Sequence, residues 1–167
     1  MRASSVKIAL LRLMVLLALA LALPGPAAVA APTESVSAPT ASAPEDADYA
    51  AGKQAIAAGN WQAAADAFSR VVATDAGNAN AHNFLGYAYR KSGKLDLAFK
   101  HYAEALRRNP KHRGAHEYIG ETYLLTNNLA KAEEHLKALD RICTFGCEEY
   151  DDLKKAVAEY KRNNANK

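Results

Sequence analysis

The chain has 167 residues, of which 50% are hydrophobic and 23% are charged, and its formal net charge is +3. The first thirty residues hold three of the 21 Lys and Arg and no acidic residue, so the remainder has 18 basic side chains against 18 acidic ones. A near-neutral chain lacks the clustered positive charge that nucleic-acid phosphates require, so we expect no nucleic-acid partner.

Residues 1–30 have the organisation of a secretory signal. Three basic residues come first, an apolar run follows over residues 13–23, and Pro24 ends the run shortly before small residues at 28–30. An uncleaved membrane anchor is the alternative, but eleven apolar residues are fewer than the roughly 20 that span a bilayer. We therefore expect a cleaved signal, with membrane contact only through the signal if it is kept.

The segment after the signal predicts no packed structure. Residues 31–44 are rich in Pro, Ala, Ser and Thr and poor in large apolar side chains, which is typical of a disordered leader. Export together with an Ala-rich composition indicates a bacterial protein of the periplasm.

Small residues recur every 34 residues at two positions of a repeated unit: Gly52, Gly86 and Gly120, and Ala64, Ala98 and Ala132. A third position keeps a large side chain in each unit: Phe68, Tyr102 and Leu136. The apolar spacing within a unit predicts two amphipathic helices joined by a short turn. The small residues are expected where the two helices approach closely, and the large ones fill the space beside them.

The middle unit resembles the tetratricopeptide repeat family, through Leu85-Gly86, Tyr89, Ala98, Tyr102, Ala105 and Pro110. The third unit has Thr144 in place of the final proline, and the first has Ala55 and Ala76 in place of the tyrosine and the proline. The resemblance implies an all-α fold, a right-handed α-solenoid of antiparallel helix pairs with about seven helices. Its units are residues 45–78, 79–112 and 113–146.

Residues 147–167 predict a last helix and a tail. Apolar residues recur there at helical spacing, acidic residues come first and basic residues last, as the helix dipole favours. Because the end of a repeat array exposes an apolar face, we expect this helix to cap the third unit.

In tetratricopeptide arrays the first helices line a concave groove that holds a peptide or a helix, and this role comes to the present chain by resemblance. The implied partner-binding residues are Tyr49, Lys53, Asn80, Asn83, Tyr87, Arg90, Lys91, Glu117 and Glu121. The asparagines could bind a peptide backbone, Arg90 a carboxylate, and the two glutamates a basic segment. For any one of them, a merely solvated helix face is an equal alternative.

Cys143 and Cys147 are the only cysteines, and in an oxidising compartment we expect them to form a disulfide that fixes the last helix. A redox-active pair, and reduced or metal-bound thiols, are the alternatives. The spacing lacks the two intervening residues usual for thiol oxidoreductases.

The five histidines are interpreted as packed side chains, because no carboxylate or cysteine cluster completes a metal-ligand set around them. No nucleophile elbow, phosphate-binding glycine loop or carboxylate pair is present in the sequence. We therefore expect no catalytic residue, metal, cofactor or small-molecule substrate.

Together these features predict an exported, non-enzymatic adaptor that binds a protein or peptide segment in its groove. The alternatives are a redox-responsive protein that uses Cys143 and Cys147, and a structural subunit of a cell-envelope assembly.

Overall fold

The computed structural model describes residues 46–165, which form α-helices and no strand. The predicted signal (1–30) and leader (31–44) lie outside these residues. The seven helices within the described range are α1 (Ala47–Ala57), α2 (Trp61–Thr74), α3 (Ala79–Lys91), α4 (Leu95–Arg108), α5 (Arg113–Leu125), α6 (Leu129–Ile142) and α7 (Glu148–Asn164). The expected all-α fold with about seven helices is confirmed.

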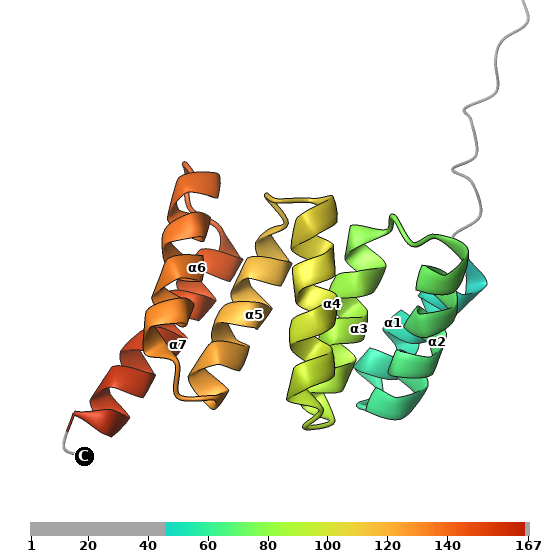
Figure 1. The fold of residues 1–167 in the computed structure, drawn as a ribbon, viewed down its shortest axis with the longest axis horizontal. Helices are drawn as coiled ribbons and strands as arrows, with labels where there is room; N and C mark the ends of the chain where they lie inside the picture. The colour runs from blue at the N-terminus through green and yellow to red at the C-terminus, as the bar shows by residue number, and fades with distance from the viewer. Residues whose placement is uncertain (1–45, 166–167) are drawn as a thin grey trace, which may run out of the picture. The chain divides into compact units, whose positions relative to one another are not determined.

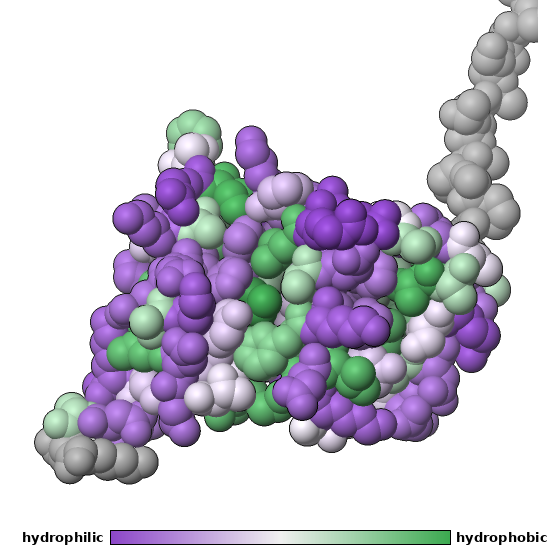
Figure 2. Space-filling model, viewed as in Figure 1, coloured by the Kyte–Doolittle hydropathy of each residue, from purple (hydrophilic) through white to green (hydrophobic). Residues whose placement is uncertain are grey.

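The helices follow one another as antiparallel pairs, which stand side by side in chain order (Figure 1). Each helix packs against the next one, and α3 also contacts α5 directly, as α5 contacts α7. We call the side of the array formed by the first helices α1, α3 and α5 and by α7 the inner face, and direct contacts along it join α3, α5 and α7. The second helices α2, α4 and α6 lie toward the viewer in Figure 1, and Figure 2 shows mainly hydrophilic residues there with smaller hydrophobic patches among them.

Side chains of the sequence specify where most helices begin. A side-chain atom just before the helix accepts a backbone N–H of the first turn, which would otherwise have no partner. Five residues act in this way: Asp46 for α1, Asn60 for α2, Asn78 for α3, His112 for α5 and Asn128 for α6. The boundaries of these five helices are thus encoded locally.

The turn inside each pair needs a left-handed residue. Gly59 has a φ of 68° and Gly93 a φ of 73°, and the third pair places Asn127 there with a φ of 58°. Asparagine tolerates this region better than most residues that carry a side chain. Asn127 also accepts a hydrogen bond from the hydroxyl of Tyr160 at 3.2 Å, which ties this turn to α7.

The glycines of the repeat lie where large side chains cross the first helix. A Cβ at Gly52 would come within 2.6 Å of the Phe68 ring, and one at Gly86 within 2.7 Å of the Tyr102 ring. At Gly120 the neighbour is Leu153 of α7, at 2.6 Å, rather than Leu136 of the same pair. Leu153 of α7 thus occupies the space that an aromatic ring of the second helix fills in the first two pairs.

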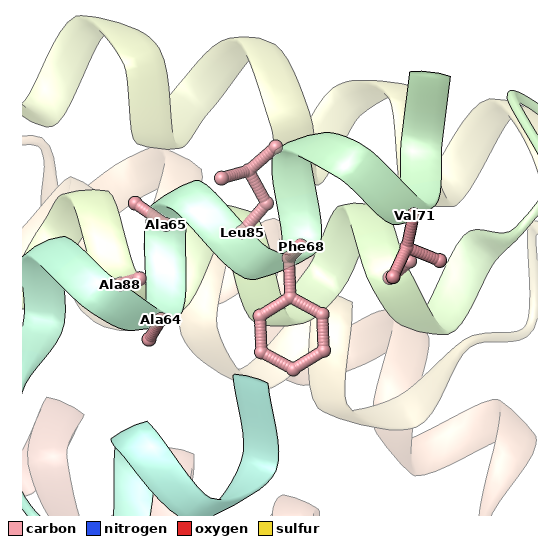
Figure 3. Close-up of a cluster of buried hydrophobic side chains, with 7 residues drawn as sticks. Ala64, Ala65, Phe68, Val71, Leu85 and Ala88 are labelled. Atoms are coloured by element: carbon pink, nitrogen blue, oxygen red, sulfur yellow. The ribbon is translucent and has the colours of Figure 1, made fainter. Parts of the chain in front are cut away.

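The core consists of successive clusters between neighbouring helices. In the first cluster, Phe68 and Val71 of α2 pack with Leu85 of α3, beside small alanines from both helices (Figure 3). In the last cluster, Leu153 and Val157 of α7 pack on Ala132 and Leu139 of α6. The apolar stripe of α7 is therefore buried against the third pair.

The connection from α6 to α7 is short and closed by the cysteines. Cys143 and Cys147 are joined as a disulfide, with Cα atoms 5.7 Å apart. Gly146 turns the chain with a φ of 85°, and Phe145 at the tip is fully exposed. None of the helices within residues 46–165 combines the length and the apolar composition that a membrane-spanning helix needs.

Candidate functional site

Arg90 is the centre of a cluster on the inner face. Its guanidinium forms an ion pair with Glu121 of α5 at 2.7 Å, with only 14% of the Arg90 side chain exposed. The same group lies over the rings of Tyr87 and Tyr118, at 5.3 and 5.4 Å from their centroids, in cation–π geometry. Arg90 thus joins α3 to α5, and its charge is already paired within the protein.

The predicted residues of the first pair lie apart from this cluster. Tyr49 is partly buried, with its ring 5.4 Å from Phe68 and 5.9 Å from Phe84, so it belongs largely to the core. Lys53 is exposed on α1. Lys91, at the end of α3 in the second pair, is exposed as well, and its ammonium lies 5.2 Å from the ring centre of Trp61 in the first pair.

A pocket of about 320 Å³ opens on the inner face between α3, α5 and the start of α7. We call it the acidic pocket, and its lining residues are Asn83, Phe84, His112, Gly114, Glu117, Tyr118, Glu148, Glu149 and Asp152. It brings together two of the predicted groove residues, Asn83 and Glu117. The other groove residues lie outside it.

Asn83 and Glu117 are buried although both are polar. Asn83 is 4% exposed, and its Oδ1 has no hydrogen-bond partner among the residues that the structure describes. Glu117 is 8% exposed and has no ion pair or hydrogen bond within residues 46–165. Burial, followed by the charges of Glu121, Asp152 and Glu149, raises the pKa of Glu117 to about 8, against a smaller opposing effect of Arg90.

His112 and Asn80 are engaged at the rim of the acidic pocket. His112 Nδ1 accepts the backbone N–H of Ala115 at 3.1 Å, so the ring proton is on Nε2 and is donated to Asn80 Oδ1 at 2.9 Å. Burial lowers the pKa of His112, which keeps the ring neutral. This histidine therefore brings no positive charge to the pocket.

A second hollow of about 320 Å³ lies further along the inner face and is more apolar. It is lined by Arg90, Glu121, Leu124, Leu125, Ala156, Glu159 and Tyr160. Leu125 is 59% exposed there, so it adds apolar surface to the hollow beside Leu124 and Ala156. We call it the apolar hollow.

Sequence reasoning missed the contribution of α7 to this face. Glu148 and Asp152 were interpreted only as partners of the helix dipole, yet both line the acidic pocket. A signal existed, because Glu148 follows Gly114 by 34 residues, as Gly114 follows Asn80. The helix after the third unit thus continues the repeat period as a further first helix.

The other histidines form two equivalent pairs. His82 Nδ1 lies 3.2 Å from His101 Nδ1, and one repeat later His116 Nδ1 lies 2.9 Å from His135 Nδ1. The described part of the chain contains no group of three or more His, Cys, Asp or Glu arranged to hold a metal ion. The paired rings belong to the packing between helices.

Comparison with known proteins places the chain among repeat proteins. A family model described as tetratricopeptide repeat matches residues 49–110 and 90–146. No curated protein of similar sequence was found.

Solved structures share the fold at low sequence identity. The type III secretion translocator chaperone SycD of Yersinia enterocolitica has a TM-score of 0.64 at 18% identity, over 71% of this chain and 83% of SycD. The TPR2B domain of yeast Sti1, in a complex with pHsp70, has a TM-score of 0.65 at 14% identity, over 70% of this chain and 94% of that one. PcrH in complex with the chaperone-binding region of PopD has a TM-score of 0.61 at 19% identity, over 71% and 90%.

These structures show the same arrangement of helix pairs, and the family model covers more than half of the sequence. The chain belongs to the tetratricopeptide repeat family.

Proposed function

We propose that this chain is a non-enzymatic adaptor that binds a segment of another protein along its inner face. The observation that carries the proposal is the pair of hollows on that face. One is lined by Asn83 and Glu117, whose buried Oδ1 and carboxyl group have no hydrogen-bond partner within residues 46–165, and the other by an exposed aliphatic side chain. Such groups are stabilised when a ligand supplies hydrogen bonds and covers the apolar surface.

The solved structures of the same fold support this assignment. PcrH was solved with a region of PopD, and SycD with a peptide of the translocator YopD. Their sequences are too distant to transfer a particular partner, so the proposal is limited to a protein or peptide segment.

Export completes the proposal. The basic residues and the apolar run of residues 1–30 support secretion across the inner membrane, and a disulfide between Cys143 and Cys147 suits an oxidising compartment such as the periplasm. Fractionation of cells that express the full chain would test its location, and N-terminal sequencing of the product would test whether the signal is removed. A cytosolic protein that keeps residue 1 would contradict the proposed export.

The binding face is tested by affinity capture from an envelope extract with two matched variants. Leu125→Asp places a charge in the apolar hollow, and Leu97→Asp places the same charge at another exposed leucine, on α4. We expect Leu125→Asp to lose a partner that the wild type and Leu97→Asp both retain. If Leu97→Asp alone loses the partner, binding uses the surface of the second helices and the proposed site is wrong.

A further inference from the structure

We propose that the acidic pocket receives a basic side chain, the guanidinium of an arginine or the ammonium of a lysine, from the bound protein segment. This inference rests on the proposed function and specifies the chemistry of the partner. The pocket presents hydrogen-bond acceptors and negative charge, and no Lys or Arg is among its lining residues in the described part of the chain.

The first argument concerns hydrogen bonds. Asn83 Oδ1 is buried without a hydrogen-bond partner from residues 46–165, which costs free energy in the absence of a donor. The nearly buried Glu117 carboxyl group, from the next first helix, lines the same pocket without a hydrogen-bond partner in residues 46–165. Guanidinium and ammonium groups carry several donors and no acceptor, so one such group can donate to the Glu117 carboxyl group, and it reaches Asn83 Oδ1 when the amide turns toward the pocket.

The second argument concerns charge. Among the carboxylates of the pocket, Glu149 forms an ion pair with the exposed Arg113 at 3.4 Å. Glu148 and Asp152 have no ion pair within the described residues, and neither has Glu117, whose buried carboxyl group would ionise when a cation binds beside it. The neutral ring of His112 does not offset them, so the pocket attracts a cation.

The helix dipole does not account for this arrangement. Acidic side chains in the first turn of α7 complement its N-terminus, which explains Glu148 and Glu149 as surface residues. It does not explain the buried Asn83 on α3 or the buried Glu117 in the middle of α5. These two residues point to a ligand that is held between helices.

The third argument concerns shape. The pocket holds on the order of ten waters at roughly 30 Å³ each, which is room for the end of an arginine side chain. Phe84 and Tyr118 line it with aromatic rings, on which a guanidinium stacks favourably. A Cβ at Gly114 would lie 3.3 Å from Asn83 Nδ2, so glycine keeps this wall open.

A direct test uses small probes and the full chain. NMR spectra near neutral pH are recorded during titration with Nα-acetyl-arginine amide, with the matching citrulline and glutamate derivatives as uncharged and acidic controls. We expect saturable shifts at Asn83 and Gly114 with the arginine probe only, in the millimolar range, because one side chain carries little binding free energy. Equal shifts with citrulline, or shifts with the glutamate probe instead, would overturn the proposal.

Two variants connect the shifts to the pocket charge. Asp152→Asn keeps the shape of the pocket and removes one charge, and Glu117→Gln keeps the shape and removes the carboxyl group that a bound cation would ionise. Glu134→Gln removes one charge from the exposed face of α6. The first two should weaken arginine binding about tenfold, as expected when a charged hydrogen-bond partner is lost, and the third should leave it unchanged. Circular dichroism verifies that each variant folds. Unchanged affinity in folded Glu117→Gln and Asp152→Asn would contradict the proposal.

Selection of displayed random peptides on the full chain separates this proposal from the proposed function. Both proposals would be supported by selected peptides that share a basic residue at one position. Such peptides should no longer bind the Glu117→Gln variant and should still bind Glu134→Gln. Peptides selected without a basic residue would overturn the acidic-pocket proposal and leave peptide binding intact. If no peptide is selected, the proposed function fails, and the proposal that rests on it fails as well.

Discussion

At the scale of single residues, burial of Glu117 couples stability to pH. Its folded-state pKa of about 8 lies above the ordinary value of 4.5. Between these values the unfolded chain releases the proton while the folded chain retains it, so stability falls as pH rises through this interval. The charged groups facing Glu117 are Arg90 from α3, Glu121 from α5, and Glu149 and Asp152 from α7.

Glu117→Gln should remove this loss of stability at high pH, because a neutral amide of the same shape replaces the carboxyl group. We expect the variant to be more stable than the wild type by at least about 1 kcal/mol above pH 8, with a smaller difference near pH 5. Urea unfolding at a series of pH values measures this, with Glu134→Gln as the control at an exposed carboxylate. Parallel pH profiles for the wild type and Glu117→Gln would contradict the assigned pKa.

The histidine pairs act in the opposite direction. Burial first, then the neighbouring His82 or His116, lowers the pKa of His101 and of His135 to about 4, below the ordinary 6.5. The unfolded chain gains protons below pH 6.5 that the folded chain does not bind until about pH 4. Stability contributed by the neutral pairs is therefore complete above pH 6.5 and is lost as pH falls toward 4.

Replacing both titrating rings in His101→Gln/His135→Gln should make the protein less sensitive to acid. We expect the drop in unfolding free energy between pH 6.5 and 4.5 to shrink by about 1 kcal/mol for each pair, after allowance for partial exposure. Thermal unfolding across this range measures it. An equal change in unfolding free energy for the wild type and the double variant between these pH values would show that the pairs carry no such coupling.

At the scale of helices, the close approaches at Gly86 and Gly120 differ in what lies opposite. A Cβ at Gly86 meets the rigid ring of the buried Tyr102 at 2.7 Å, whereas one at Gly120 meets the terminal methyl groups of Leu153 at 2.6 and 2.9 Å. A ring of α4 is fixed by its packing, but the end of a leucine side chain can rotate away. Although the two Cβ contacts are similarly short, we expect substitution at Gly86 and at Gly120 to cost different amounts of folding free energy.

We expect Gly86→Ala to destabilise the protein by about 1 to 3 kcal/mol and Gly120→Ala by less. Each substitution also gains helix propensity, by up to about 1 kcal/mol, and this gain is common to both. Comparing the urea unfolding midpoints of the two variants cancels this shared gain in helix propensity. A larger loss for Gly120→Ala would show that Leu153 is held as rigidly as the aromatic ring.

The sequence predicted helices well because their signals are local. The apolar spacing within each 34-residue unit predicted its two helices, and the structure adds Asn60, Asn78 and Asn128 as residues that bind the first turns of α2, α3 and α6. Contacts across helices depend on how the pairs rotate against one another, which periodicity does not encode. For this reason the sequence did not predict the ion pair between Arg90 and Glu121 or the packing of Leu153 against Gly120.

The sequence also predicted part of the candidate site and missed another part. Asn83 and Glu117 were placed on the groove from their repeat positions, and the acidic pocket contains both. Tyr118 and Phe84 were not, because each follows a predicted position by one residue and the width of the exposed helix face comes only from packing. The burial of Glu117 likewise depends on α7, which closes that side of the pocket.

At the scale of the whole molecule, the helices form an array in which each pair contacts only its neighbours. The described chain has three separate buried clusters, rather than a single core. In such arrays the end opens more readily than the middle, since it has a neighbour on one side only. Helix α7 is at this end, and it contributes three carboxylates to the acidic pocket.

A ligand in the pocket should therefore restrain α7, because it bridges side chains of α3, α5 and α7 that are otherwise joined by few polar contacts. At saturation with an arginine-containing peptide from the selection, we expect amide hydrogen exchange to slow in α5 and in the first turns of α7. Exchange in α1 and α2 should stay unchanged, since these helices lie outside the pocket. Uniform slowing across all helices would mean that the array opens as one unit, and slowing confined to α1 and α2 would place the ligand at the other end of the inner face.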